Sequence, residues 1–216
     1  MKRTTPFVLV LSIVALALGL GLNYLLKPTA KKPPQIEGLL WPQSKTLTDI
    51  ALIDNQETPF TVDNLKGKWS LLFFGYTHCP DVCPTTLTVL KGVKQRLAEQ
   101  AQETANTQYV FISVDRERDT PEVLTNYVKY FDPEFIGVTG SQAQIEKLTR
   151  QLGVVYMRIA DPNNKGSYLV DHSASIMLID PLGRMIALFS APHAVETIAK
   201  RYLTMRQFLN QQTEYR

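Results

Sequence analysis

The chain has 216 residues, of which 44% are hydrophobic and 20% are charged, and its formal net charge is +3. This composition is that of a globular protein and excludes a largely disordered chain. The small net charge, with no long basic run beyond the N-terminal region, excludes nucleic acid as a partner. Two cysteines are too few for a disulfide framework, and a chain of this size does not need one.

The first predicted element is an N-terminal transmembrane helix. Residues 7–26 contain no charged side chain and are almost entirely apolar, and a membrane-spanning helix needs about 20 such residues. A cleaved signal peptide has a shorter apolar core, so we predict an uncleaved signal anchor at 7–26 after a short tail at 1–6. The run begins too early for a transit peptide, which indicates a bacterial protein. A stiff, exposed linker is expected at 27–39, and one domain at 40–216.

The predicted domain begins with two short strands around a polar turn, at 49–53 and 59–62. Residues 69–76 (WSLLFFGY) are almost continuously apolar, which is typical of a strand buried on both faces. A helix is predicted at 84–100 because apolar residues recur there at helical spacing. Pro84 suits its first position, where the missing N–H of proline is no loss.

The second half of the domain is predicted from the same signals. Thr120 and Ser141 are expected to cap helices, because their hydroxyls can accept hydrogen bonds from the first turn, and Gly153 is expected to end one. The predicted elements are a buried strand at 109–115, a helix at 121–130, an extended segment at 135–138, a helix at 141–152, a strand at 155–159, a hairpin of 175–180 and 185–189, and a helix at 195–210.

The order of these elements predicts an α/β domain of thioredoxin-like fold, with a central mixed sheet flanked by helices. Strands that alternate with helices are joined by parallel crossovers, whereas the final hairpin adds antiparallel strands. An insertion precedes that hairpin.

The cysteines lie in the loop 75–84 (GYTHCPDVCP) between a predicted strand and a predicted helix. A helix N-terminus stabilises a nearby thiolate and so lowers the thiol pKa. Two interpretations follow: the thiolates of Cys79 and Cys83 bind one soft metal ion, Cu(I) or Zn(II), or Cys79 attacks a disulfide and Cys83 resolves it. Three residues separate the cysteines, whereas thioredoxin-type redox motifs have two, which disfavours a plain thioredoxin activity. The loop has no arginine, which disfavours peroxide reduction.

A metal held by two thiolates needs a third ligand, and the chain has three histidines. His172 is favoured, because in a thioredoxin-like plan its loop lies opposite the helix N-terminus that carries the cysteines. His78 adjoins Cys79 and is expected to point away from the site. His193 begins the last helix and is expected to face solvent.

Three separated segments resemble the Sco/SenC family of copper proteins, which assist the assembly of cytochrome c oxidase. The loop GYTHCPDVCP is similar to the family's metal loop. Residues 113–121 (SVDRERDTP) are similar to its SVDPERDTP segment, with Arg116 where proline is common. Asp171-His172-Ser173 is similar to its downstream histidine segment. The resemblance covers most of the predicted domain and favours copper over zinc.

The resemblance implies one copper ion per chain, as Cu(I) or Cu(II), bound by Cys79, Cys83 and His172. It implies a metallochaperone that delivers copper to the dinuclear centre of an oxidase subunit. The alternative is a thiol–disulfide oxidoreductase that keeps the cysteines of that subunit reduced. The expected partners are that subunit and other periplasmic copper chaperones. The expected location is the bacterial inner membrane, as a single-pass protein with its domain in the periplasm or otherwise outside the cytoplasm.

Two carboxylates are expected to support the site. Asp81 lies between the cysteines, where it could tune the charge of the copper site, hydrogen-bond the loop, or cap the following helix. Asp115 ends a predicted strand near the site and could support the ligands or form a turn.

Overall fold

The computed structural model describes residues 5–26, 40–99, 106–162, 164 and 166–211. The chain divides into two compact units, 1–34 and 35–216. The described residues of the first unit form helix α1 (Thr5–Leu26). The predicted linker at 27–39 and most of the predicted tail lie outside the described residues.

The helical prediction for the N-terminal run is confirmed, but the membrane-spanning prediction is not supported. Across the described part of the chain, no helix is both long enough and apolar enough to cross a membrane.

The second unit is built on an eight-stranded mixed sheet in the order β1-β10-β9-β4-β5-β6-β2-β3. The central strands β4, β5 and β6 pair in parallel, and β9 pairs antiparallel with β4. All seven residues of β4 are buried, as the apolar run predicts. The bounds are β1 Leu40–Thr46, β2 Leu52–Asp54, β3 Pro59–Phe60, β4 Trp69–Gly75, β5 Thr107–Ser113, β6 Ile136–Thr139, β9 Ile176–Ile179 and β10 Arg184–Phe189.

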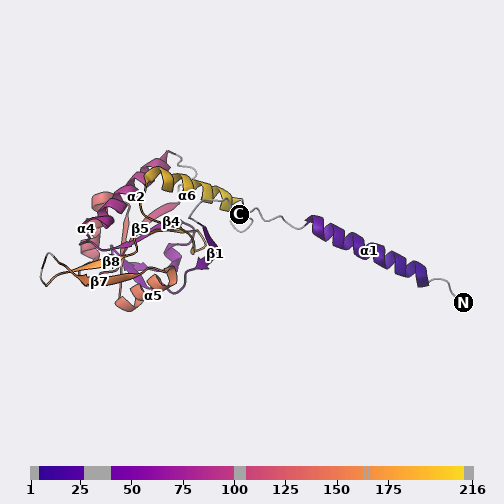
Figure 1. Ribbon diagram of the computed structural model, residues 1–216, viewed down its shortest axis with the longest axis horizontal. Helices are drawn as coiled ribbons and strands as arrows, with labels where there is room; N and C mark the ends of the chain where they lie inside the picture. Colours follow the sequence, from indigo (N-terminus) through magenta and orange to yellow (C-terminus); the bar gives the residue numbers. More distant parts are fainter. Residues whose placement is uncertain (1–4, 27–39, 100–105, 163, 165, 212–216) are drawn as a thin grey trace. The chain divides into compact units, whose positions relative to one another are not determined.

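Helices cover both faces of this sheet (Figure 1). Helix α2 contacts both α4 and α6 on one face, and α5 lies on the opposite face. The predicted caps are confirmed: Thr120 and Ser141 accept hydrogen bonds from Val123 and Gln144, and Gly153 ends α5 at φ 71°. The helices are η1 Val62–Asn64, α2 Val82–Ala98, α4 Pro121–Phe131, α5 Gln142–Leu152 and α6 Val195–Asn210.

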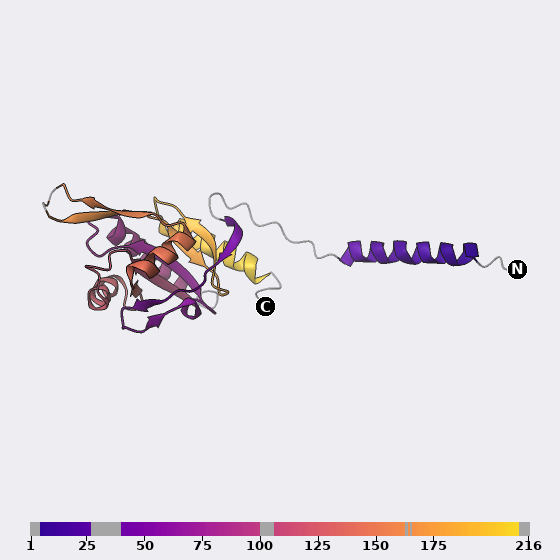
Figure 2. The same ribbon diagram turned by 90° about the horizontal axis from the view of Figure 1, so that it is seen from below.

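A two-stranded ribbon of β7 (Tyr156–Ala160) and β8 (Tyr168–His172) forms a separate sheet. Figure 2 shows it as an orange arm that extends from one edge of the unit. The ribbon is inserted before the hairpin of β9 and β10, where the sequence predicts an insertion.

Three local predictions are corrected. His172 ends strand β8 and does not lie in a loop. The predicted strand at 155–159 pairs only within the ribbon, outside the main sheet. Helix α2 begins at Val82, two residues earlier than expected, so Pro84 occupies its third position. Proline is tolerated there because the N–H groups of a first helical turn have no intrahelical partner.

The α/β prediction, with a central mixed sheet flanked by helices, is confirmed. Strands β1 and β8 were not expected. Strand β1 (LWPQSKT) carries a proline and several polar residues, as an edge strand can. Strand β8 (YLVDH) is too short and too polar for a periodicity signal.

Candidate metal centre

The cysteine loop is held between the end of β4 and the start of α2. The N–H of Cys79 donates to the Tyr76 carbonyl at 3.3 Å, and Cys83 is the second residue of α2. Gly75 is the last residue of β4 and lies next to Cys83. A Cβ at this position would lie 2.6 Å from Cys83 Sγ and 2.8 Å from the Phe111 ring. Glycine is therefore required for Cys83 to pack against the end of the strand.

The three predicted ligands are brought together. The ligand atoms of Cys79, Cys83 and His172 all lie within 4.8 Å of one another. Cys83 Sγ is 3.3 Å from His172 Nε2, and the Cys83 N–H donates to Cys79 Sγ at 3.4 Å. Both cysteines are free thiols; Cys83 is fully buried and Cys79 is 9% exposed. The cluster is therefore shielded from bulk water but reachable at one edge.

The ring of His172 is oriented by neighbours on both sides. Its Nδ1 lies 3.2 Å from the Ser173 carbonyl, so Nδ1 carries the proton and donates there. The rings of Phe73 and Tyr76 pack edge-on against it, each with a centroid separation of 6.0 Å. Nε2 thus faces the sulfur atoms, which is the direction that a metal ligand requires.

The two thiols differ strongly in acidity. A hydrogen bond from the Cys83 side chain lowers the pKa of Cys79 to about 4, against the opposing effect of burial; His172 and the backbone N–H groups of Asp81 and Cys83 also lower it. The shared hydrogen bond and burial raise the pKa of Cys83 far above its usual range. The reduced pair therefore holds one proton, and Cys79 is the thiolate.

We expect the reduced, metal-free protein to carry one thiolate per chain from neutral pH down to about pH 4. Because folding lowers this pKa from 9.0, the ionised Cys79 contributes stability that is fully present above about pH 9 and is lost as the pH falls through about 4. Thiolate absorbance at 240 nm, followed by pH titration, measures this. The Cys79→Ser variant should lose the absorbance change near pH 4. If the thiolate absorbance of the wild-type protein changed near pH 9 and not near pH 4, the assignment of the thiolate to Cys79 would be contradicted.

The other two histidines lie outside the cluster. His78 is exposed, as expected, with its Nδ1 3.1 Å from the Thr77 hydroxyl. His193 does not face solvent, contrary to the prediction: it is half-buried, and its Nε2 donates to the Ala174 carbonyl at 2.7 Å. That contact holds the segment that follows His172.

Asp81 does not cap the helix through its side chain, whereas Asp115 forms a turn, one of its two expected roles. Asp81 occupies the N-cap position of α2, but its side chain makes no capping hydrogen bond; it contributes a backbone N–H to Cys79. Asp115 is fully buried. It forms a turn through its carbonyl, which accepts from the N–H of Asp119 at 2.9 Å, and an ion pair with Arg118.

Asp119 is a supporting residue that the sequence reasoning missed. It is fully buried and accepts hydrogen bonds from the Thr77 N–H (2.9 Å), the Thr77 hydroxyl (2.6 Å) and the Ser113 hydroxyl (2.6 Å). These contacts tie the start of the cysteine loop to the end of β5. Burial raises the pKa of Asp119 despite these hydrogen bonds. Its place in the SVDRERDTP segment was the one signal available in the sequence.

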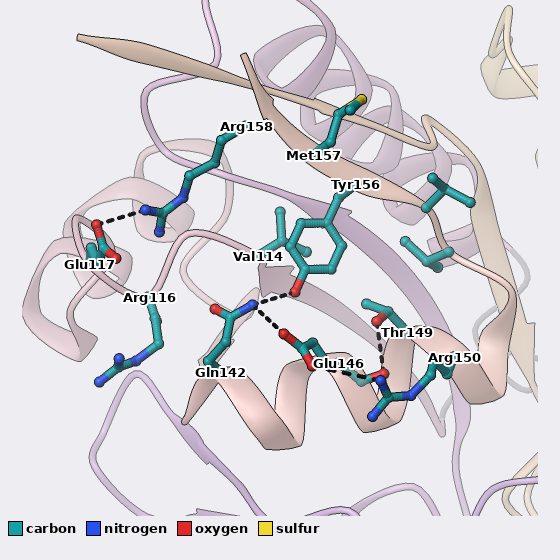
Figure 3. Close-up of a pocket in the computed structure, with 12 residues that line it drawn as sticks. Val114, Arg116, Glu117, Gln142, Glu146, Thr149, Arg150, Tyr156, Met157 and Arg158 are labelled. Carbon is teal, nitrogen blue, oxygen red and sulfur yellow. Dashed lines mark hydrogen bonds and ion pairs between the residues drawn. The ribbon is translucent and has the colours of Figure 1, made fainter. Parts of the chain in front are cut away.

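A polar pocket lies beside the candidate metal centre. It has a volume of about 640 Å³ and is lined by residues of β7 and α5, with the Arg158–Glu117 ion pair and the Gln142–Tyr156 hydrogen bond on its walls (Figure 3). Val155 and Met157 line this pocket and also a smaller one at His172. The two pockets therefore adjoin at Val155 and Met157.

Comparison with known families decides the assignment. A sequence profile of the SCO1/SenC family matches residues 42–207. The chain belongs to the SCO1/SenC family. A protein of Stutzerimonas stutzeri, described as copper-binding, is 35% identical over 181 residues, which cover 84% of this chain and 87% of that one. An SCO2-like protein of Rickettsia prowazekii is 37% identical over 192 residues, covering 88% and 92%.

Solved structures of family members agree with this fold. The crystal structure of Arabidopsis thaliana ScoI with copper bound has 36% identity and a TM-score of 0.68, covering 73% of this chain and 96% of that one. The solution structure of apo Sco1 from Thermus thermophilus has 39% identity and a TM-score of 0.65, covering 79% and 94%. The family resemblance and the thioredoxin-like α/β fold inferred from the sequence are therefore confirmed.

Proposed function

We propose that this protein is a copper metallochaperone that binds one copper ion through Cys79, Cys83 and His172 and passes it to the copper-centre subunit of cytochrome c oxidase. The observation that carries this proposal is the convergence of two sulfur atoms and one imidazole nitrogen within 4.8 Å. Copper-bound structures of family members support it.

The donor set suits copper in both oxidation states. Soft thiolates favour Cu(I), and imidazole suits Cu(II). The 3.3 Å separation of Cys83 Sγ and His172 Nε2 fits two atoms that share one ion at bond lengths of about 2.0–2.3 Å. The orientation of His172 requires no rearrangement to present its lone pair. Copper is the cargo here, and a site with three ligands can release it by ligand exchange to another thiol-rich site.

Anaerobic metal analysis and electron paramagnetic resonance test this proposal. The reduced protein should bind one copper per chain and pass it to the metal-free oxidase subunit, and also accept copper from other periplasmic chaperones. Oxidation of the Cys79 thiolate and the Cys83 thiol to a disulfide removes two electrons and one proton, and it should abolish binding. Copper retained by the oxidised protein, or no transfer to the subunit, would contradict the proposal.

A second candidate is a thiol–disulfide oxidoreductase, which the unequal acidity of the two thiols favours. The Cys79 thiolate would attack a disulfide of the oxidase subunit, and Cys83 would then displace the reduced subunit and leave a Cys79–Cys83 disulfide. An external thiol would have to restore the pair. Oxidase assembly that survives His172→Ala in cells would favour this role, and assembly that fails would favour copper transfer.

The proposed location is the outer side of a bacterial inner membrane, where the copper centre of the oxidase is expected. This rests on the sequence, and protease accessibility in intact spheroplasts measures it. Protection of residues 40–216 from external protease would contradict it.

A further inference from the structure

Strand β8, which carries His172, is attached to the body of the domain by side chains. The ribbon of β7 and β8 forms no ladder with the main sheet. Ser173 donates its N–H to the Val155 carbonyl, so the pairs Arg158↔Val170 and Ala160↔Tyr168 are the non-hydrogen-bonded ones. The backbone groups of Val170 and Tyr168 therefore face away from β7, towards the rest of the domain.

Arg118 occupies this free edge of β8. Its Nη1 donates to the Tyr168 carbonyl at 3.1 Å, and its guanidinium carbon lies 3.8 Å from the centre of the Tyr168 ring. The guanidinium carbon also lies 5.5 Å from the centre of the Tyr76 ring. Arg118 thus contacts both β8 and the loop that leads to the cysteines.

Buried Asp115 fixes this arginine in place. Its Oδ2 accepts from Arg118 Nε at 2.5 Å, and its Oδ1 accepts from the Tyr168 hydroxyl at 2.7 Å. A planar guanidinium with a carboxylate on one edge and aromatic faces around it has little freedom to turn. The carboxylate therefore connects Arg118 and Tyr168 into one unit.

Tyr76 links this unit to the metal centre. Burial raises the pKa of Tyr76, and the backbone N–H of Val170, two residues before His172 in β8, opposes this rise from beside the phenolic oxygen. The edge of the Tyr76 ring packs on the imidazole of His172, and the Tyr76 carbonyl accepts from Cys79. One residue therefore contacts the strand of the third ligand and the loop of the first two.

We propose that Arg118 is the positioning residue for His172: held by Asp115, it clamps β8 to Tyr76 and so keeps the imidazole over the two cysteines. This inference deepens the proposed copper-binding function and rests on it for its metal readout. Its structural readout, the attachment of β8, does not depend on copper. Residues that orient a metal-binding histidine typically contribute 10- to 100-fold to metal affinity.

The test compares Arg118→Met with Arg116→Met. Arg116 is exposed, has no ion pair in the described part of the chain, and points away from the Glu117–Arg158 pair (Figure 3). In the metal-free protein, Arg118→Met should speed hydrogen exchange of the Val170 amide by about tenfold or more, whereas Arg116→Met should leave it unchanged. Tyr168→Phe removes only the Tyr168 hydroxyl, which donates to Asp115, and it should give a smaller increase in the exchange rate. This variant replaces Arg118→Met in the test if Arg118→Met does not fold.

The metal readout is a double-mutant cycle. Arg118→Met should lower Cu(II) affinity about tenfold and shift the paramagnetic resonance spectrum towards that of His172→Ala. In the His172→Ala background, Arg118→Met should not lower the Cu(II) affinity further, because the imidazole that Arg118 positions is absent. Arg118→Lys keeps the positive charge but lacks the planar guanidinium and its several N–H donors, so it should retain only part of the Cu(II) affinity.

Two results would overturn the inference. One is wild-type exchange at Val170 in both Arg118→Met and Tyr168→Phe. The other is an equal loss of Cu(II) affinity with and without His172. If wild-type protein bound no copper, the proposed function would fail, while faster exchange at Val170 would still establish Arg118 as the clamp of β8.

Discussion

Replacing His172 with alanine is expected to lower the affinity for Cu(II) by about a hundredfold, or about 2.7 kcal/mol. The imidazole Nε2 lies 3.3 Å from Cys83 Sγ and points into the cluster. Cu(II) depends on such a nitrogen ligand, whereas Cu(I) is well served by two soft thiolates. Cu(I) affinity should therefore fall much less, and competition titrations with chelators for each oxidation state measure the difference.

The matched control is His78→Ala. His78 adjoins Cys79 in sequence, but its ring is exposed and contacts Thr77, so both affinities should stay at the wild-type value. Cys83→Ser, in contrast, should abolish binding of both ions. An unchanged Cu(II) affinity in His172→Ala, or a loss in His78→Ala as large as that in His172→Ala, would remove His172 from the ligand set.

Replacing Asp119 with alanine is expected to destabilise the reduced protein by about 3 kcal/mol, because a buried donor left without a partner costs about 1–3 kcal/mol. The substitution removes the acceptor for Thr77 N–H, for the Thr77 hydroxyl and for the Ser113 hydroxyl at once. Since Thr77 lies in the cysteine loop, two residues before Cys79, copper affinity should fall as well. Urea unfolding of the reduced protein measures the change.

Asp119→Asn separates the hydrogen bonds from the charge. Burial raises the pKa of Asp119, so the charged form opposes folding, and this cost grows as the pH rises through the folded pKa. The amide oxygen can replace Oδ2 and the amide group can donate to the Thr77 hydroxyl, so we expect a loss of less than about 1 kcal/mol. Asp63→Ala, which removes an exposed carboxylate paired with Lys66, should change stability by less than about 0.5 kcal/mol. Equal losses in Asp119→Ala and Asp63→Ala would contradict the role of Asp119.

The sequence by itself determined the framework of this protein. The apolar run at 69–76 and the caps Thr120 and Ser141 are local signals, because burial on both faces of a strand and the first turn of a helix each leave a pattern in neighbouring residues. The spacing of Cys79 and Cys83 is equally local. The family motifs then supplied copper, which spacing alone left open between metal and redox chemistry.

The tertiary structure decided which side chains act together. Ribbon β7–β8 carries no strong periodicity, and only folding brings its last residue, His172, to 3.3 Å from Cys83. Asp119 and Thr77 are 42 residues apart in the chain, so no short sequence window could pair them. The low pKa of Cys79 arises mainly from the hydrogen bond with Cys83 and from His172, since the acidity of a buried thiol depends on groups that only folding brings into contact. The sequence thus predicted the two cysteines and the histidine as ligands, and folding brings their ligand atoms within 4.8 Å of one another.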